Sequence, residues 1–178
     1  MDRVSHNTLS AALAILIYSY TELPSKYDFS QLIVLIALSI LYGSYIPDLF
    51  HRGVKRNSFL HSIFGMLVIT LISILLYTYI TNFLYCCLLI SSPLLLYITI
   101  LLSYFSHIVT DMLTVQGVTV LYPIRKRKFR IAKLRYNHPV FRIFTTIILI
   151  LSILIYARNI EILELIILSF NYLIFIYD

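Results

Sequence analysis

The sequence predicts an all-α protein: a polytopic membrane bundle of about six transmembrane helices. Of its 178 residues, 60% are hydrophobic and only 12% are charged, and the mean hydropathy is +0.90. A soluble domain normally carries about twice this share of charged residues. Apolar runs continue through the whole chain. We therefore expect one integral membrane domain over 1–178.

Six apolar segments have approximately the length needed to cross a bilayer. The first is short for a span, and the second ends at Pro47-Asp48, where a helix reaches the interface. The third follows the basic loop 48–58. The fourth is long, and Ser91-Ser92-Pro93 inside it predicts a kink, a tilt or a break. Two further apolar runs complete the chain. The expected spans are 8–21, 31–47, 59–80, 83–112, 140–157 and 160–177.

The cations indicate how these spans are oriented. When the spans are threaded alternately, one face keeps only Lys26 and Arg158. The other face receives twelve cations: Arg3, Arg52, Lys55, Arg56, Arg125, Lys126, Arg127, Lys128, Arg130, Lys133, Arg135 and Arg142. Cytoplasmic loops carry the excess of Lys and Arg. We therefore expect a multi-pass protein of the cytoplasmic membrane with both termini in the cytoplasm.

His107 and Asp111 are the centre of the functional hypothesis. They lie four residues apart in an apolar segment, so both share one face of a helix. Ionisable groups inside membrane-type segments are costly and usually functional. The alternative is a hydrogen bond that packs one span against its neighbour.

Three more candidate ligands fall on the same predicted face of the membrane. Asp48 follows Pro47, which restricts the preceding residue and can fix the direction of the carboxylate. His61 opens the next span, so the hairpin brings it near Asp48. His6 precedes the first span and can reach the same place. The alternatives are a turn cap for Asp48 and a solvated residue or helix cap at His6.

Imidazole combined with carboxylate suits zinc, manganese or non-haem iron better than calcium or copper(I). A fifth ligand leaves room for a second ion, bridged by a carboxylate, and two-metal sites suit phosphoester hydrolysis. The predicted metal ligands are His6, Asp48, His61, His107 and Asp111.

The order of short motifs carries a family resemblance. The motifs are Ser5-His6, Gly43-Ser44-Tyr45-Ile46-Pro47-Asp48, His51-Arg52-Gly53, His61-Ser62, Ser106-His107-Ile108-Val109-Thr110-Asp111, and Gly117 before Leu121-Tyr122-Pro123. This pattern resembles the YdjM-like family of membrane-bound metal-dependent hydrolases. More remotely, the order His, Asp, His, His-x-x-x-Asp is similar to the first metal ligands of zinc-dependent phospholipases C and related single-strand nucleases.

The resemblance implies that four residues surround one ion: Asp48, His61, His107 and Asp111. It also implies that His6 and Asp111 reach a second ion. The phospholipases carry further His and Glu ligands for a third ion. Here the only later histidine is His138, with no matching cluster. One or two ions are therefore expected.

These observations predict a metal-dependent hydrolase of a lipid-like phosphoester at the cytoplasmic interface. Asp48 or Asp111 is the expected catalytic proton acceptor. His51 and Arg52 are candidates for supporting the ligands or contacting substrate. Two other classes stay open: a divalent-metal transporter, and a non-catalytic scaffold that recruits a cytosolic partner.

The run 124–135 is the only dense block of charge. Its expected partners are anionic lipid headgroups, at about 1 kcal/mol for each basic residue near the membrane surface. Nucleic-acid binding is not expected, because the block lacks interleaved stacking aromatics and a folded recognition element. Oligomeric state is not predicted.

Overall fold

The computed structural model describes residues 2–21, 29–49, 57–84, 93–135 and 138–177, the side chains of 21, 81–84 and 161–177 excepted. Within these ranges the regular structure is helical, as predicted, and the only strand-like pairings are two isolated bridges. The elements are α1 (Arg3–Thr21), α2 (Phe29–Ile40), the π-helical turn η2 (Leu41–Tyr45), α3 (Ile63–Leu84), α4 (Pro93–Met112) and α5 (Pro139–Tyr177).

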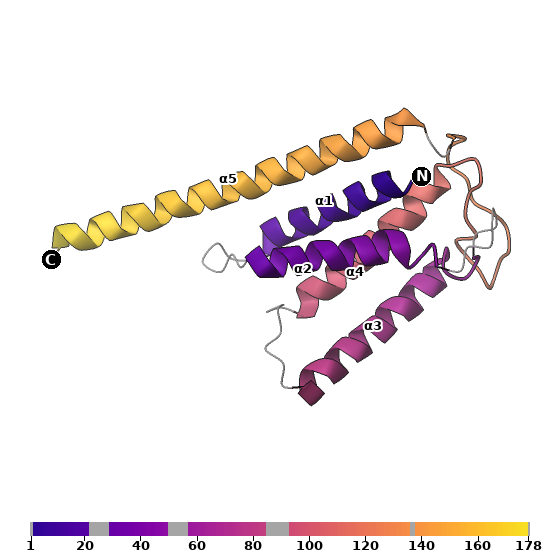
Figure 1. Cartoon of the computed structure of the whole chain (residues 1–178), viewed down its shortest axis with the longest axis horizontal. Helices are drawn as coiled ribbons and strands as arrows, with labels where there is room; N and C mark the ends of the chain where they lie inside the picture. The colour runs from indigo at the N-terminus through magenta and orange to yellow at the C-terminus, as the bar shows by residue number, and fades with distance from the viewer. Residues whose placement is uncertain (1, 22–28, 50–56, 85–92, 136–137, 178) are drawn as a thin grey trace.

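The helices run back and forth between two ends of a bundle (Figure 1). Helix α1 packs against α2, α4 and α5, and α4 also contacts η2 and α3. The apolar core between α1, α2 and α4 is formed by Ala14, Ile15, Ile17, Tyr18, Leu32, Leu35, Leu95, Leu96 and Ile100. Helix α4 therefore lies at the centre of the bundle.

Among the described residues, three helical segments are long and apolar enough to cross a membrane: Ile63–Ile80, Pro93–Met112 and Pro139–Ile160. The segment Phe29–Tyr45 is a shorter apolar helix. The expected span 83–112 begins instead at Pro93, and the residues between α3 and α4 lie outside the described part. Proline is well tolerated in the first turn of a helix, where its missing N–H has no helical acceptor to bond.

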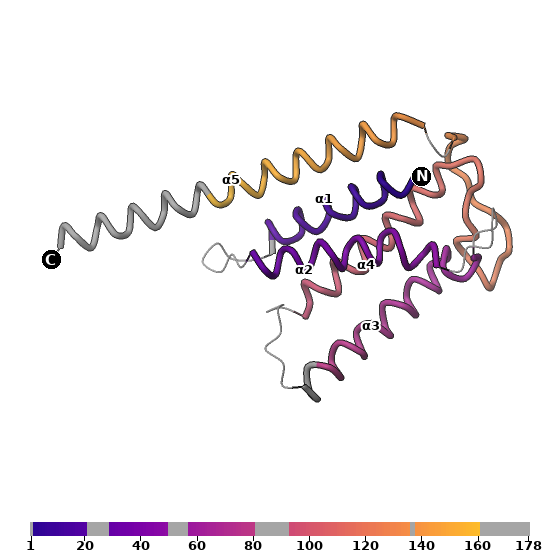
Figure 2. The backbone as a smooth tube through the Cα atoms, in the orientation of Figure 1, coloured from indigo at the N-terminus to yellow at the C-terminus, as the bar shows by residue number. Residues whose placement is uncertain are grey.

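The C-terminal region differs from the prediction. Segments 140–157 and 160–177 were expected to be separate spans, but both belong to the single helix α5. No Gly or Pro follows Pro139 in this helix, so the backbone has no local reason to turn at Arg158-Asn159. Asn159 Nδ2 donates to Ser19 O, 2.9 Å away, near the end of α1. The coloured part of α5 thus runs the length of α1 without turning back (Figure 2), and a count of six spans is not confirmed.

The segment 113–135 is irregular but held in place. Val118 and Phe129 exchange backbone hydrogen bonds of 3.1 and 2.8 Å, and Thr114 pairs with Leu134. Gly117 has a φ of 60°, a left-handed conformation that favours glycine. Ile63 N donates to Val120 O at 3.0 Å, which joins the segment to the start of α3. This segment covers the same end of the bundle as the N-terminus (Figure 1).

Candidate metal centre

The five predicted ligands lie together at one end of the bundle. His6 belongs to the first turns of α1, and Asp48 lies in the turn after η2. His61 lies in the turn before α3, while His107 and Asp111 share the last turns of α4. His6, His61, His107 and Asp111 are at most 2% exposed, whereas the Asp48 side chain is 22% exposed.

Local sequence explains why His6 faces α4. Asp2 precedes α1 and accepts a hydrogen bond from Ser5 N at 2.9 Å, the bond that an N-cap residue makes with its helix. Arg142 Nε of α5 donates to the other carboxylate oxygen of Asp2 at 2.6 Å. Burial acts to raise the pKa of Asp2, but the hydrogen bonds from Ser5 and the Arg142 guanidinium outweigh burial and lower it. Helix α1 is therefore fixed at the end that carries His6.

The turn that carries His61 is equally defined. Ser62 caps α3, since its Oγ accepts from Gly65 N at 3.0 Å. A Cβ on Gly65 would lie 2.0 Å from Phe59 O, so the turn closes over the helix only with glycine there. Tyr104 of α4 donates from its hydroxyl to Leu60 O at 2.9 Å. His61 is thereby held against α4.

Four potential metal-ligand atoms of these residues face one small space. His61 Nε2 is 3.4 Å from His107 Nε2 and 3.4 Å from Asp111 Oδ2. His107 Nε2 is also 3.4 Å from Asp111 Oδ2. Asp48 Oδ1 completes the group, 3.5 Å from His61 Nε2 and 3.6 Å from His107 Nε2. Direct charge-assisted N–H···O bonds are shorter, about 2.7–2.9 Å. The four potential metal-ligand atoms therefore surround a shared point, at distances longer than those of direct hydrogen bonds between them.

The second nitrogen of each ring fixes its orientation. His107 Nδ1 is 3.0 Å from Gly43 O, and His61 Nδ1 is 3.0 Å from Asn57 O. A carbonyl oxygen only accepts, so both Nδ1 atoms carry the proton. In the neutral rings, both Nε2 atoms therefore present lone pairs to the same space, with a carboxylate oxygen beside them. A cation or an added proton at this point would satisfy the arrangement.

Electrostatics at His61 favour positive charge. Burial lowers the pKa of His61, but the carboxylates of Asp111 and Asp48 outweigh burial and raise it. The same two carboxylates would stabilise a metal cation at this position.

His6 approaches Asp111 from the other side. His6 Nε2 is 3.5 Å from Asp111 Oδ1, the oxygen that does not face His61 and His107. Its ring stacks on His107 with centroids 4.1 Å apart, and its Nδ1 is 3.4 Å from Thr110 Oγ1. In the described part of the chain, two overlapping groups could hold a metal ion: His6, His107 and Asp111, and Asp48, His61 and His107.

Sequence reasoning did not identify the groups that orient the rings. These are Gly43 O, Asn57 O and the hydroxyl of Thr110. Asn57 lies four residues before His61, a spacing that places a carbonyl within reach in any helical turn. His51 and Arg52 lie outside the described residues. His138 is separate from the site; its Nδ1 accepts from Val140 N at 3.4 Å at the start of α5.

The family model for the YdjM inner membrane protein matches residues 1–178, and the chain belongs to this family. The family assignment and the apolar helices make this an inner membrane protein. No curated protein and no solved structure matches the chain. The remote similarity to zinc-dependent phospholipases C is therefore not shown by these comparisons.

Proposed function

We propose that this member of the YdjM family is a metal-dependent hydrolase acting on a lipid-like phosphoester at the cytoplasmic interface of the membrane. One observation carries the proposal. The lone pairs of His61 Nε2 and His107 Nε2 face each other at 3.4 Å beside carboxylate oxygens of Asp48 and Asp111. Helix-packing hydrogen bonds would pair donors with acceptors, whereas with both rings neutral all four of these atoms are acceptors.

The spacing of the donors favours zinc. Four ligands about 2.0–2.1 Å from a zinc ion at tetrahedral corners are about 3.3–3.4 Å apart. The five measured separations among Asp48 Oδ1, His61 Nε2, His107 Nε2 and Asp111 Oδ2 are 3.4–3.6 Å. Manganese and iron accept the same donor types and remain alternatives. A second ion between His6 Nε2 and Asp111 Oδ1 would use Asp111 as a bridge.

The burial of each proposed ligand indicates its role in hydrolysis. When bound, a divalent ion lowers the pKa of coordinated water and polarises a phosphoryl oxygen. Asp111 has both oxygens directed at histidines and is 1% exposed, so its role is to hold the site together. Asp48 is the most exposed of the five ligands and is the better candidate to accept a proton from the attacking water. Arg52 and His51 are proposed to contact the substrate phosphate.

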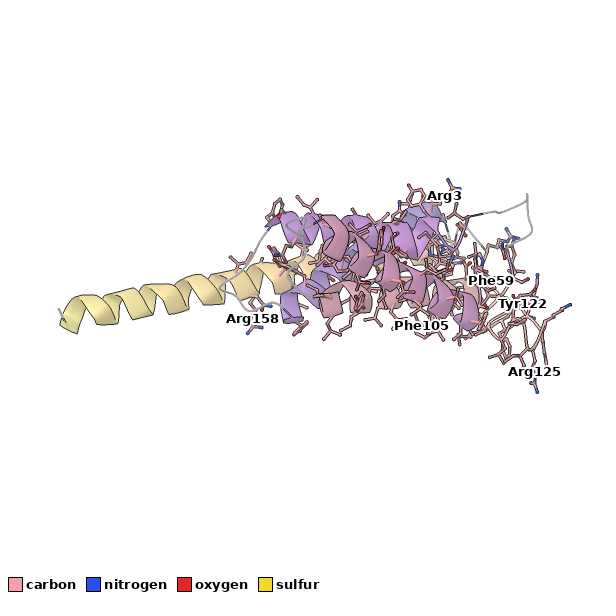
Figure 3. All side chains as sticks on the ribbon, turned by 90° about the horizontal axis from the view of Figure 1, so that it is seen from below. Arg3, Phe59, Phe105, Tyr122, Arg125 and Arg158 are labelled. Carbon is pink, nitrogen blue, oxygen red and sulfur yellow. The ribbon has the colours of Figure 1, made fainter. Side chains whose placement is uncertain are left out.

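The cations support a cytoplasmic site. Arg3, Tyr122 and Arg125 lie at one end of the bundle, and Arg158 lies towards its other end, where α5 continues beyond the bundle (Figure 3). The first end also carries the five ligands. By the positive-inside rule, this end faces the cytoplasm. A site at headgroup depth favours an amphipathic substrate, such as a phospholipid or an isoprenoid phosphate ester.

Two observations bear on the competing functions. A divalent-metal transporter needs a polar path beyond the site, but the other half of the bundle is closed by the apolar cluster that includes Tyr18, Leu35 and Leu96. A scaffold that recruits a cytosolic partner would not need buried ligands, and it would keep its function when these were replaced. Uptake into proteoliposomes would establish the transporter and replace the hydrolase proposal.

The first experiment measures metal by mass spectrometry in the detergent-purified protein and in a His107→Ala/Asp111→Ala variant. The control is Thr146→Ala/Arg158→Gln, which removes two exposed polar side chains from α5. We expect near-stoichiometric metal in the parent and control and its loss from the site variant, with all three equally helical by circular dichroism. Absence of metal from the parent, even after reconstitution with zinc, manganese or iron, would contradict the proposal.

Substrate class is tested with the metal-loaded protein. Release of a headgroup or of phosphate from a phospholipid and an isoprenoid phosphate is compared with hydrolysis of a soluble aryl phosphate ester. We expect turnover of a lipid substrate that disappears in the site variant. Activity confined to the soluble ester would contradict the lipid part of the proposal and leave the hydrolase part standing.

The basic segment is the proposed docking surface for anionic lipid. All seven cations of this segment are exposed: Arg125, Lys126, Arg127, Lys128, Arg130, Lys133 and Arg135. In the described part of the chain none of them forms an ion pair with an acidic group. Ile124 and Ile131, 88% and 66% exposed, stand among them and can enter the headgroup region. Charge and apolar tips together match an anionic bilayer surface.

The test reconstitutes the protein in nanodiscs of phosphatidylcholine with phosphatidylglycerol and measures the fraction of each lipid retained in native mass spectrometry. Changing Arg125, Lys126, Arg127 and Lys128 to Gln is expected to abolish enrichment of phosphatidylglycerol. Arg158→Gln at the opposite end is the control and should retain enrichment. Equal retention in all variants would contradict lipid docking.

A further inference from the structure

We infer that Ser39 is a positioning residue for the proposed metal site, on which this inference rests. Its side chain is fully buried in α2. Its hydroxyl joins α1 to α4 one helical turn away from the candidate metal centre, and this junction sets the distance between His6 and His107.

The hydroxyl of Ser39 makes two hydrogen bonds, and the direction of each can be assigned. Ser39 Oγ lies 2.5 Å from the backbone oxygen of Ser10 in α1 and 2.5 Å from Oγ of Ser103 in α4. A carbonyl oxygen only accepts, so the single hydroxyl proton of Ser39 goes to Ser10. The other bond is then donated by Ser103. One hydroxyl of α2 therefore connects two other helices, in the order Ser103 to Ser39 to Ser10.

Both partners of Ser39 lie one turn from a candidate ligand. Ser10 follows His6 by four residues in α1, and Ser103 precedes His107 by four residues in α4. Residues four apart share one face of a helix and lie about 6 Å apart along its axis. The helix faces that Ser39 joins are therefore the faces that carry the two imidazoles. At the site these rings stack, with centroids 4.1 Å apart.

Gly43 continues the junction towards the site. It follows Ser39 by four residues, and a Cβ at this position would lie 2.0 Å from Ser10 Oγ and 3.1 Å from Ser103 O. Gly43 thus lies against the same two residues to which Ser39 is bonded. Its carbonyl oxygen accepts from His107 Nδ1 at 3.0 Å. The segment from Ser39 to Gly43 therefore contacts α1 and α4 at two successive levels, first by hydrogen bonds and then by close packing.

Other hydroxyls of α4 bond to their own helix instead. Ser106 and Thr110 donate to backbone oxygens of α4 at 2.7 and 2.8 Å. Without the Ser39 hydroxyl, Ser103 is expected to turn to its own helix in the same way. Both interhelical bonds are then lost, while α1 and α4 keep their backbone hydrogen bonds. The expected result is a helical protein in which the two imidazoles are less firmly held together.

The test compares Ser39→Ala with the matched control Ser152→Ala. Ser152 of α5 is 1% exposed, and its hydroxyl donates to Ile148 O of its own helix at 2.8 Å. The control therefore removes a buried hydroxyl without removing an interhelical bond. Solid-state NMR of metal-free, histidine-labelled protein measures the ring-to-ring contact between His6 and His107, with single Gln variants to assign the resonances. Competition with a chelator measures zinc affinity, and circular dichroism checks that all variants are equally helical.

In the parent and in Ser152→Ala, a strong contact between the rings of His6 and His107 is expected. In Ser39→Ala, this contact should weaken and zinc affinity should fall about tenfold, the lower end of the effect of groups that support metal ligands. An unchanged ring contact in Ser39→Ala would overturn the inference. Because the contact is measured without metal, this outcome is distinct from failure of the parent to bind zinc.

Ser103→Ala separates positioning from a general loss of packing. Alone, it should weaken the ring contact and lower zinc affinity, since it removes the donor to Ser39. In the Ser39→Ala background it should have little further effect, because the hydrogen bond is already absent. Additive losses in the double variant would contradict the inference. Should Ser39→Ala fail to fold, the ring contact in Ser103→Ala alone decides the question.

Discussion

Helices α3 and α4 are neighbours of similar length, and both are apolar enough to cross a membrane, yet they carry different chemistry. In α4, 50% of the spanning residues are buried, against 17% in α3. Helix α4 contacts α1, α2, η2 and α3, whereas the described element that packs most closely on α3 is α4. The candidate ligands His107 and Asp111 occur on the covered helix. Ionisable side chains are tolerated within a membrane where other helices enclose them and give them partners.

Helix α3 is the converse case, because much of its apolar surface is not covered by other helices. Phe64, Leu67, Leu71, Leu75 and Leu76 are all more than half exposed. Its polar side chains bond mainly to their own helix, as when Ser73 donates to Ile69 O at 2.7 Å. Tyr42 of η2 donates to the same serine hydroxyl at 2.6 Å and links α3 to the bundle. Lipid can cover this apolar surface without any loss of hydrogen bonds.

The largest expected effect is on metal binding. Asp111→Asn should reduce the zinc affinity by more than about 100-fold, because one change weakens the contacts of Asp111 with three histidines and removes a negative charge. The matched change on α3 is Thr70→Val, which should leave affinity within about twofold. Chelator competition measures both. Equal affinities for the two variants would show that the covered face of α4 is not a metal site.

The next largest expected difference between α4 and α3 is the loss of unfolding free energy when an apolar side chain is truncated. Ile108→Ala on α4 removes a side chain that is 1% exposed and should lower the free energy of unfolding by about 2–5 kcal/mol. Leu75→Ala on α3 removes one that is 59% exposed and should cost about 0.5 kcal/mol or less. Unfolding of both variants in mixed detergent micelles measures the difference. Similar losses would indicate that α3 is covered by protein, as in an oligomer.

A smaller effect is expected for the bond that joins α4 to the His61 turn. Tyr104→Phe leaves the buried Leu60 carbonyl without its 2.9 Å donor and should cost about 1–3 kcal/mol. Metal affinity should also fall, since Leu60 precedes His61. Tyr20→Phe, on a residue of α1 that is 72% exposed, is the comparison. If Tyr104→Phe behaves like Tyr20→Phe, the turn is held by other contacts.

The smallest effect concerns α1, the helix that covers α4. Replacing Asp2 with Ala should cost about 1 kcal/mol at neutral pH, as for other N-caps. The pKa of Asp2 is lowered below 3.8 in the folded protein, so its contribution is complete above that value and is lost as the pH falls through the folded-state pKa. The unfolding free energies of parent and variant should therefore converge in acid. A constant difference at all pH values would show that the charge on Asp2 is not involved.

Sequence reasoning predicted the helical membrane class because composition alone determines it. It also selected residues that the structure brings together, since the four-residue spacing of His107 and Asp111 fixes their common face in any helix. The Asp48 and His61 pair depended on a hairpin that spacing only suggested. The roles of all five as metal ligands stay predictions.

Other features depend on contacts that sequence spacing does not encode. Hydropathy divided 140–177 into two spans, but no Gly or Pro occurs there to break the backbone, and α5 continues through both segments. The carbonyl acceptors of the two histidines come from backbone positions whose side chains give no sign of the role. The stacking of His6 on His107 joins residues of α1 and α4, which only the packed bundle brings together.

The contact between His6 and α4 also has a consequence for biogenesis. His6 lies beside Thr110, which is 104 residues further along the chain. At about 5–20 residues per second of synthesis, α1 waits on the order of 5–20 s in the membrane before its partner emerges from the ribosome. During that interval the imidazole of His6 lacks the carboxylate that it later faces. If the centre binds metal as proposed, its ligand set is complete only after α4 has been synthesised, and loading would be a late step in assembly.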